Sequence, residues 1–168
     1  MDAVARRAGV ARATLYAHFS SREALIAAVT ERAISEAGQA IASANPAEGD
    51  PREALARVLA AAWRTLGRYH ALVEINARLA PARLRNIHAP ILGQLRPLLE
   101  RGQADGAFNR DLPLDWMLTV ILELIHAASR EVRGRRLPPK AAERALVASV
   151  AGALSPPTNR ARELASHE

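Results

Sequence analysis

The chain has 168 residues, a length that fits one ordinary domain or one domain with a small appendage. Hydrophobic residues make up 49% of it, aromatic residues only 4%, and 37 residues are alanine, so the composition predicts an all-α fold with an aliphatic core. The absence of cysteine excludes a disulfide scaffold, a thiolate zinc site and a cysteine nucleophile. Because the N-terminus lacks a signal peptide and the most apolar stretch, 116–128, is too short to span a membrane, we expect a soluble cytoplasmic protein that does not contact a membrane.

The formal net charge is +6, and 22 of the 23 cationic residues are arginine. GC-rich coding would produce this bias without any functional meaning, whereas clustering on one face would indicate phosphate binding. Residues 1–22 carry four arginines, Arg6, Arg7, Arg12 and Arg22, against the single acidic residue Asp2. This N-terminal cluster is therefore the first place to look for contacts with nucleic acid.

Glycine, proline and capping residues divide the chain into short and long helices. Ser20 or Ser21 caps the third helix, Asp50 and Pro51 begin the fourth, and Pro97 is expected to kink the sixth. The predicted helices cover about 2–8, 11–18, 22–44, 51–67, 71–79, 84–105, 114–133 and 140–154. Residues 158–168 are expected to form a frayed tail.

The first two predicted helices meet at Gly9, which supplies a turn conformation that other residues resist. Two short helices joined by such a turn are typical of a helix-turn-helix unit. In this arrangement Ala5 lets the helices approach each other. The side chains expected to pack inward are Val4, Ala8, Val10, Leu15 and Phe19. The outer face of the second helix would then meet the DNA groove and its phosphates.

The string from Val4 to Phe19, followed by Ser-Ser-Arg-Glu-Ala-Leu, closely resembles the N-terminal signature of the TetR family of transcriptional regulators. The run from Glu100 to Phe108 is similar to the element before that family's dimerisation helices. The resemblance implies a helix-turn-helix DNA-binding domain at 1–30 and a helical ligand-binding and dimerisation domain at 31–157. It also implies a repressor that binds double-stranded operator DNA as a homodimer and is released by a small-molecule effector.

The resemblance assigns roles to individual residues of the motif. Arg12 and Ala13 match positions at the start of the recognition helix that meet base edges, where an arginine can pair with guanine. The later positions of the motif match residues that contact phosphates in the family, and such contacts set the register on DNA. At the position of Tyr16, family members sometimes reach a base as well. Taken singly, Tyr16 is better explained as a packed surface aromatic and His18 as a capping side chain, whereas the whole string at this spacing favours DNA binding. The DNA-binding residues implied are Arg12, Ala13, Thr14, Tyr16, Ala17, His18 and Arg22.

Two departures from the family pattern leave an alternative open. Ala11 stands where the family usually has a serine or threonine N-cap, a loss of about 1 kcal/mol. The first helix of the family's DNA-binding domain is also missing, because Met1 falls at the start of the helix before the turn. Either the start is truncated or the chain has lost normal DNA affinity. The alternative is a dimeric helical small-molecule-binding protein without competent DNA binding.

The resemblance also implies an effector site, for which polar or aromatic residues within apolar helices are candidates. The candidates are Trp63, His70, Met117, Thr119, Glu123 and His126. An apolar cavity would favour a lipophilic effector. Trp63 and Met117 are better explained as core residues than as ligand contacts.

Glu123 and His126 have three interpretations. They could lie on a dimer seam, bonded to each other or to Arg130, or line the effector cavity, since polar groups in an apolar stretch need partners. Glu-x-x-His is also half of a di-iron motif, but the chain lacks its other carboxylates. Because no phosphate loop, nucleophile elbow or metal-ligand spacing is present, we expect no enzyme activity, metal or cofactor.

The last two predicted helices, about 114–133 and 140–154, are apolar on more than one face. A helix of this kind must be buried on both sides, either within a larger core or at a subunit interface. The sequence therefore predicts a homodimer formed through these two helices.

Overall fold

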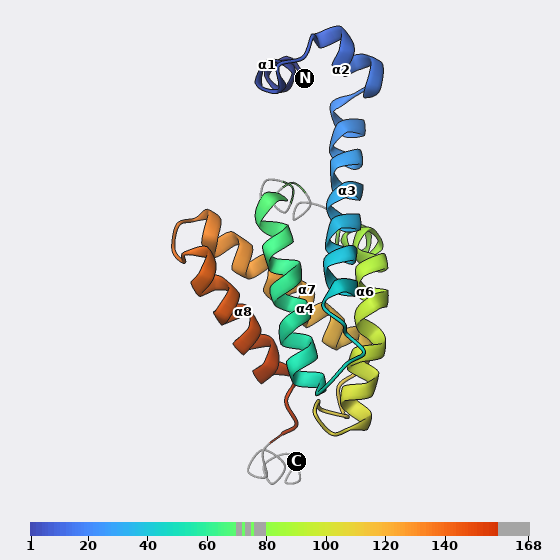
Figure 1. The fold of residues 1–168 in the computed structure, drawn as a ribbon, viewed down its shortest axis with the longest axis vertical. Helices are drawn as coiled ribbons and strands as arrows, with labels where there is room; N and C mark the ends of the chain where they lie inside the picture. The colour runs from blue at the N-terminus through green and yellow to red at the C-terminus, as the bar shows by residue number, and fades with distance from the viewer. Residues whose placement is uncertain (70–71, 73–74, 76–79, 158–168) are drawn as a thin grey trace.

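The computed structural model of the chain describes residues 1–69, 72, 75 and 80–157, and over these residues it contains helices and no strand. The α-helices are α1 (Asp2–Ala8), α2 (Arg12–His18), α3 (Arg22–Ser43), α4 (Pro51–Leu66), α6 (Pro81–Ala104), α7 (Leu114–Arg133) and α8 (Pro139–Leu154), and a 3₁₀ turn η1 (Gly67–Tyr69) follows α4. The predicted all-α fold is confirmed. Figure 1 shows α1 and α2 at one end of the molecule, carried on α3, whose far half enters a bundle with the remaining helices.

Capping side chains begin the two helices that the sequence marks most clearly. Ser21 Oγ accepts a hydrogen bond from the backbone N–H of Ala24 (3.0 Å) at the start of α3. Asp50 Oδ1 accepts from the backbone N–H groups of Arg52 (2.8 Å) and Glu53 (3.2 Å) at the start of α4. These bonds satisfy N–H groups that have no partner within their own helix.

Two helices begin earlier in the chain than the sequence predicted, and in both a proline occupies the first helical position. The helix predicted from residue 84 begins at Pro81, and the helix predicted from residue 140 begins at Pro139. Proline lacks the N–H that would be unsatisfied there, and its fixed φ suits the first turn. Of the helix predicted at 71–79, the structure describes only Leu72 and Ile75, and the predicted tail at 158–168 lies outside the described residues.

The bundle core is built from aliphatic side chains of five helices. Helix α3 packs between α4 and α6, while α7 pairs with α8, and α4 also contacts α8. Residues buried at its centre are Ile41, Leu59, Leu99, Met117, Ile121, Val150 and Leu154. The indole Nε1 of Trp63 adds a hydrogen bond to the carbonyl of Pro139 (3.3 Å), which ties α4 to α8.

The turn from α6 to α7 is held by a close contact between Gly102 and Phe108 and by several hydrogen bonds. A Cβ placed on Gly102 would lie 2.1 Å from Cδ2 of Phe108, a side chain that is 2% exposed. The N–H of Phe108 donates to the carbonyl of Gly102 (3.0 Å), so the ring lies directly over the last turn of α6. Nε2 of Gln103 donates to the carbonyls of Asn109 and Leu112, both at 2.8 Å. These contacts fix the position of α7 relative to α6.

Candidate functional site

The turn between α1 and α2 is set by Gly9, whose φ of +69° lies in the left-handed region that favours glycine. The N–H of Val10 donates to the carbonyl of Ala5 (3.1 Å) and that of Gly9 to the carbonyl of Arg6 (3.3 Å). This pair of bonds is a Schellman ending, which closes α1 and redirects the chain into α2. The predicted helix-turn-helix geometry of the two helices therefore rests on local backbone bonds.

The outer face of α2 is open to solvent. Arg12 lies at its first position, where its guanidinium contacts both carboxylate oxygens of Asp2 (Nε–Oδ1 3.1 Å, Nη1–Oδ2 3.3 Å). The same guanidinium stands over the ring of Tyr16, 5.3 Å from its centroid. The sequence-predicted DNA-binding residues are all exposed, six on α2 and one at the start of α3: Arg12, Ala13, Thr14, Tyr16, Ala17, His18 and Arg22.

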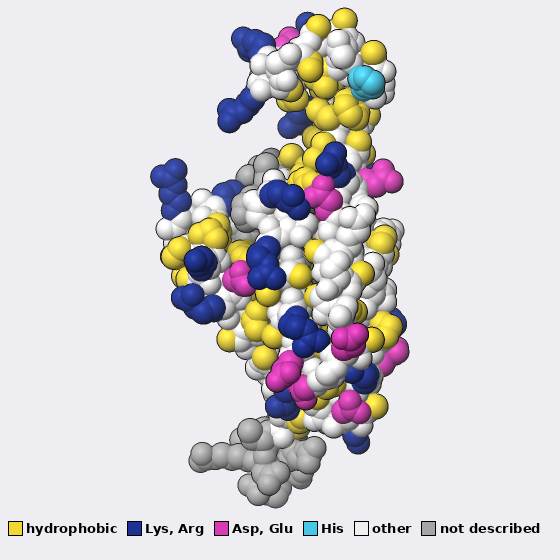
Figure 2. Space-filling view, in the orientation of Figure 1, with side chains coloured by type: hydrophobic (Ala, Val, Ile, Leu, Met, Phe, Trp, Pro, Cys, Tyr) yellow, Lys and Arg dark blue, Asp and Glu magenta, His cyan; other side chains and the backbone are white. Residues whose placement is uncertain are grey.

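The predicted packing of the two helices was wrong at three of its five positions. Leu15 is buried and Phe19 is half-buried, but Val4 (44% exposed), Val10 (41%) and Ala8 are not covered. Over the described residues α1 contacts α2 and little else, so its other faces have nothing to pack against. Figure 2 shows hydrophobic side chains at the surface of this end of the molecule, next to projecting basic ones.

A cavity of about 80 Å³ lies inside the bundle, between α3, α4, α6 and α7. Most of its wall is aliphatic, and the polar groups come from Thr30, Tyr69, His88 and His126. The remaining lining residues are Ala33, Ile34, Ala37, Ala62, Leu66, Leu72, Ile91, Leu92, Leu95, Ile121, Leu122 and Ile125. Thr30 and Ile34 also line a groove on the outside, between α3 and α6, so these two residues separate the cavity from the surface.

Two histidines face each other in the cavity wall. The rings of His88 on α6 and His126 on α7 meet edge to face, with centroids 5.7 Å apart. Burial lowers the pKa of His126 to about 4, and the neighbouring His88 and Arg130 act in the same direction. Burial also lowers the pKa of His88, partly offset by its hydrogen bond to the carbonyl of Leu84. Both imidazoles are therefore neutral at pH 7.

The other sequence-predicted ligand residues lie in different places. Trp63 and Met117 are packed in the core and do not line the cavity. Thr119 and Glu123 line a separate surface groove between α6 and α7. Glu123 is exposed there, and among the described residues no hydrogen bond joins Glu123 to His126. His70 lies outside the described residues.

Sequence reasoning missed Thr30 and His88, although helical spacing carries a signal for both. Thr30 precedes Ala33, Ile34 and Ala37, and His88 precedes Ile91, Leu92 and Leu95, each set at the i, i+3, i+4, i+7 spacing of one helix face. A polar residue on such an apolar stripe is a candidate for lining an internal cavity.

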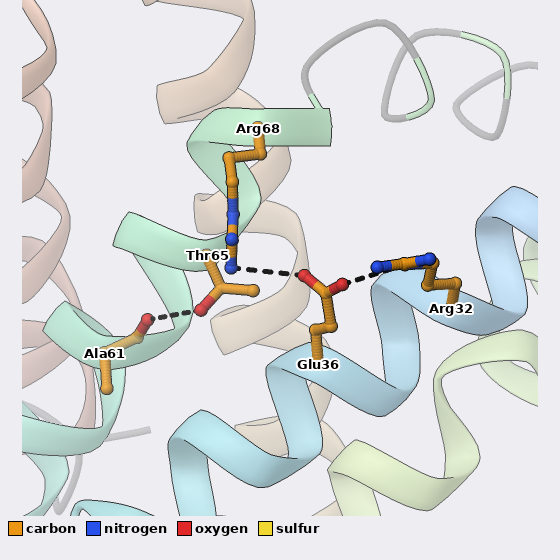
Figure 3. Close-up of polar contacts among 5 residues, drawn as sticks. All are labelled: Arg32, Glu36, Ala61, Thr65 and Arg68. Atoms are coloured by element: carbon orange, nitrogen blue, oxygen red, sulfur yellow. Dashed lines mark hydrogen bonds and ion pairs between the residues drawn. The ribbon is translucent and has the colours of Figure 1, made fainter.

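A polar cluster joins α3 to the 3₁₀ turn η1, which follows α4, beside the cavity (Figure 3). Glu36 lies between two arginines: Arg32 Nε donates to its Oε1 (3.0 Å), and Arg68 Nη2 pairs with its Oε2 (3.1 Å). The hydrogen bond from Arg32 is the largest of the influences that lower the pKa of Glu36, and a bond with Tyr69 follows. Because Tyr69 also lines the cavity, the cluster fixes one end of its wall.

Comparison with known proteins agrees with this geometry. The family model described as "Bacterial regulatory proteins, tetR family" matches residues 1–29. The HTH-type transcriptional repressor NicS of Pseudomonas putida is 30% identical over 122 residues, which are 67% of this chain and 57% of that protein. The chain thus matches little more than half the length of this curated relative, which is named as a regulator and not as an enzyme.

Two solved structures have the same fold. A TetR-family transcription regulator from Shewanella sp. is 25% identical with a TM-score of 0.63, over 90% of this chain and 84% of that one. The TetR-like regulator LfrR from Mycobacterium smegmatis, solved in complex with proflavine, is 22% identical with a TM-score of 0.68, over 88% and 80% of the two chains. Within the part of the chain that the structure describes, no helix is long and apolar enough to cross a membrane.

Proposed function

We propose that this chain, which belongs to the TetR family of bacterial regulatory proteins, is a repressor that binds operator DNA as a homodimer and is released by a small-molecule ligand. The observation that carries the proposal is the exposed face of α2, presented by a glycine turn and headed by Arg12. Residues 1–30 would form the DNA-binding domain, and residues 31–157 the ligand-binding and dimerisation domain. The protein would act in the cytoplasm, where its operator lies.

Arg12 is suited to reading a base, because its guanidinium is held in place before DNA arrives. The contacts with Asp2 and the Tyr16 ring restrict the side chain at the start of α2, the end of a recognition helix that meets base edges. Both contacts are solvent-exposed, so they are weak enough to be exchanged for a guanine edge. Thr14, His18 and Arg22 would contact the flanking phosphates.

Dimerisation would use the outer faces of α7 and α8. Trp116 on α7 is 56% exposed, and α8 presents the small residues Ala145, Ala148 and Gly152 to solvent. Small residues let helices approach closely, so a second copy packed here would form a four-helix bundle. Light scattering at micromolar concentration is expected to give the mass of a dimer, and a monomer would overturn this part of the proposal.

Helix α3 provides the connection between ligand and DNA. It begins with Arg22, next to α2, and lines the cavity with Thr30, Ile34 and Ala37 about two to four turns later. In a dimer the two recognition helices must be about one helical turn of DNA apart, roughly 34–36 Å. A ligand that moves α3 would change this separation and so weaken binding.

The DNA part is tested by fluorescence anisotropy on duplex DNA from immediately upstream of the gene, with a scrambled duplex beside it. We expect tighter binding to the upstream duplex, with an affinity that falls steeply as salt is raised. Arg12→Ala should weaken binding to that duplex by about 10–100-fold while changing binding to the scrambled one much less. Arg85→Ala, which removes one exposed arginine on α6, a helix outside both the helix-turn-helix and the proposed dimer helices, is the matched control. Equal affinity for both duplexes would refute specific recognition.

The second candidate is a dimeric helical small-molecule-binding protein without competent DNA binding. It is favoured by the thin packing of the first two helices, in which only Ala5 and Leu15 are buried, and by the lack of a side-chain cap on α2. A dimer that binds the ligand but shows no salt-dependent preference for any upstream duplex would support this candidate over the repressor.

A further inference from the structure

One buried hydroxyl in the cavity wall has no hydrogen-bond partner among the residues that the structure describes. Thr30 on α3 is 7% exposed, and its Oγ1 forms no hydrogen bond with the described residues. The other buried threonine behaves differently: Thr65 Oγ1 donates to the carbonyl of Ala61 one turn earlier (3.2 Å; Figure 3). Thr119 makes the same kind of bond to Asp115 (2.8 Å). Because buried polar groups are rarely left without a partner, the hydroxyl of Thr30 is available for a hydrogen bond to a molecule in the cavity that it lines.

The two histidines define the kind of hydrogen bond that the cavity offers. A carbonyl oxygen can only accept, so the 2.9 Å contact with Leu84 places the proton of His88 on Nδ1 and leaves Nε2 as an acceptor. The neutral ring of His126 has one donor and one acceptor nitrogen. With the Thr30 hydroxyl, which can donate or accept, the wall can satisfy a group that does both.

The cavity is unsuited to an ion. None of the described residues that line it is a carboxylate, lysine or arginine, and the side chain of Tyr69 is hydrogen-bonded to Glu36. An ion entering it would lose its hydration without gaining an opposite charge. Its volume of about 80 Å³ has room for on the order of six water molecules, at about 10–15 Å³ each, a space that one small ring with a substituent would fill.

We propose that this cavity binds a small uncharged molecule with an apolar body and one hydroxyl group, a phenol or a cycloalkanol, whose hydroxyl bonds to Thr30 and the His88–His126 pair. The inference deepens the proposed function, on which its regulatory meaning rests, by naming the chemical class of the ligand. The ligand would enter from the outer groove between α3 and α6, since Thr30 and Ile34 form the wall between the two spaces.

The test is a calorimetric titration of the full chain, without DNA, with four probes that each carry one benzene ring: phenol, toluene, benzoate and benzylammonium. We expect phenol to bind about tenfold more tightly than toluene, and both ions to bind more weakly than either. Thr30→Val keeps the shape of the side chain and should reduce phenol affinity about fivefold, the effect of one hydrogen bond, while leaving toluene affinity unchanged. Thr65→Val, which removes a buried hydroxyl that is already bonded to Ala61, is the matched control and should change neither.

Thr30→Ser retains the hydroxyl and should retain the preference for phenol, which separates recognition from any loss of packing in the valine variant. Toluene binding as tightly as phenol, or an unchanged preference in Thr30→Val, would overturn the proposal. Tighter binding of benzoate or benzylammonium would overturn it in favour of a charged ligand, and the failure of every probe would overturn it outright. Because the titration contains no DNA, each of these outcomes leaves the anisotropy result on operator binding to be judged separately.

Discussion

Replacing His126 tests whether the cavity wall excludes water from this imidazole, as its burial indicates. The ring is 4% exposed and contacts His88, with the positive charge of Arg130 nearby. Burial and these two neighbours lower its pKa from the ordinary 6.5 to about 4. The folded protein therefore binds the proton at this site less readily than the unfolded chain does.

The sign of the effect follows from proton binding. Between pH 6.5 and 4 the unfolded chain carries a proton on this histidine that the folded protein lacks, so acidification favours unfolding. The full shift corresponds to roughly 3 kcal/mol, and the portion lost between pH 7 and pH 5 is about 2 kcal/mol. The stabilisation is complete above pH 6.5 and disappears as the pH falls towards 4.

Urea denaturation at pH 7 and pH 5, at one protein concentration, measures this contribution. His126→Phe and His126→Gln both remove the titrating ring but differ in polarity, so they should differ from each other in stability at pH 7. When the pH is lowered from 7 to 5, the free energy of unfolding of each variant should nevertheless fall by about 2 kcal/mol less than that of the parent chain. Parallel losses in all three proteins would refute the reasoning, because they would show that the ring titrates alike in the folded and unfolded states.

Further predictions concern packing, caps and DNA contacts. Gly102→Ala places a Cβ against the buried Phe108 ring, which must move away. The overpacking should cost about 1–3 kcal/mol against about 1 kcal/mol gained in helix propensity, so the free energy of unfolding should fall by up to about 2 kcal/mol. Gly93→Ala on the same helix meets no atom within 4 Å and should raise it by about 1 kcal/mol; equal signs in urea denaturation would contradict this pair. Asp50→Ala removes the acceptor for two N–H groups of α4 and should lower it by about 1 kcal/mol, an expectation that unchanged denaturation would rule out. Arg22→Ala should reduce the slope of log affinity against log salt by about one without altering sequence preference, and an unchanged slope in anisotropy would exclude a phosphate contact.

Local chemistry made most helix positions predictable. The caps at Ser21 and Asp50 and the turn at Gly9 act through neighbouring backbone groups, so the sequence next to them carries the information. Helix α7 was predicted at its observed bounds, because Pro113 and Gly134 mark its ends. Pro81 shows where such reasoning fails. A proline is read from sequence as the residue that ends a helix, but here it occupies the first position of α6 and begins one.

The cavity was harder to predict because it depends on which helices face one another. His126 was noticed as a polar residue in an apolar stretch, but its partner His88 is 38 positions earlier on another helix. Nothing in a single sequence states that these two faces meet. The exposure of Val4 and Val10 was missed for the same reason, since hydrophobic character alone does not reveal whether a covering element is present.

The continuity of α3 has a mechanical consequence. Its 22 residues form one uninterrupted helix about 33 Å long, with the cavity against its middle and α2 at its first residue. A rigid rod of this length that tilts by about 5° about one end displaces the other by roughly 3 Å, close to the 3.4 Å rise of one base pair. In the proposed repressor, a ligand that tilted α3 by this small angle would therefore move α2 by about the rise of one base pair.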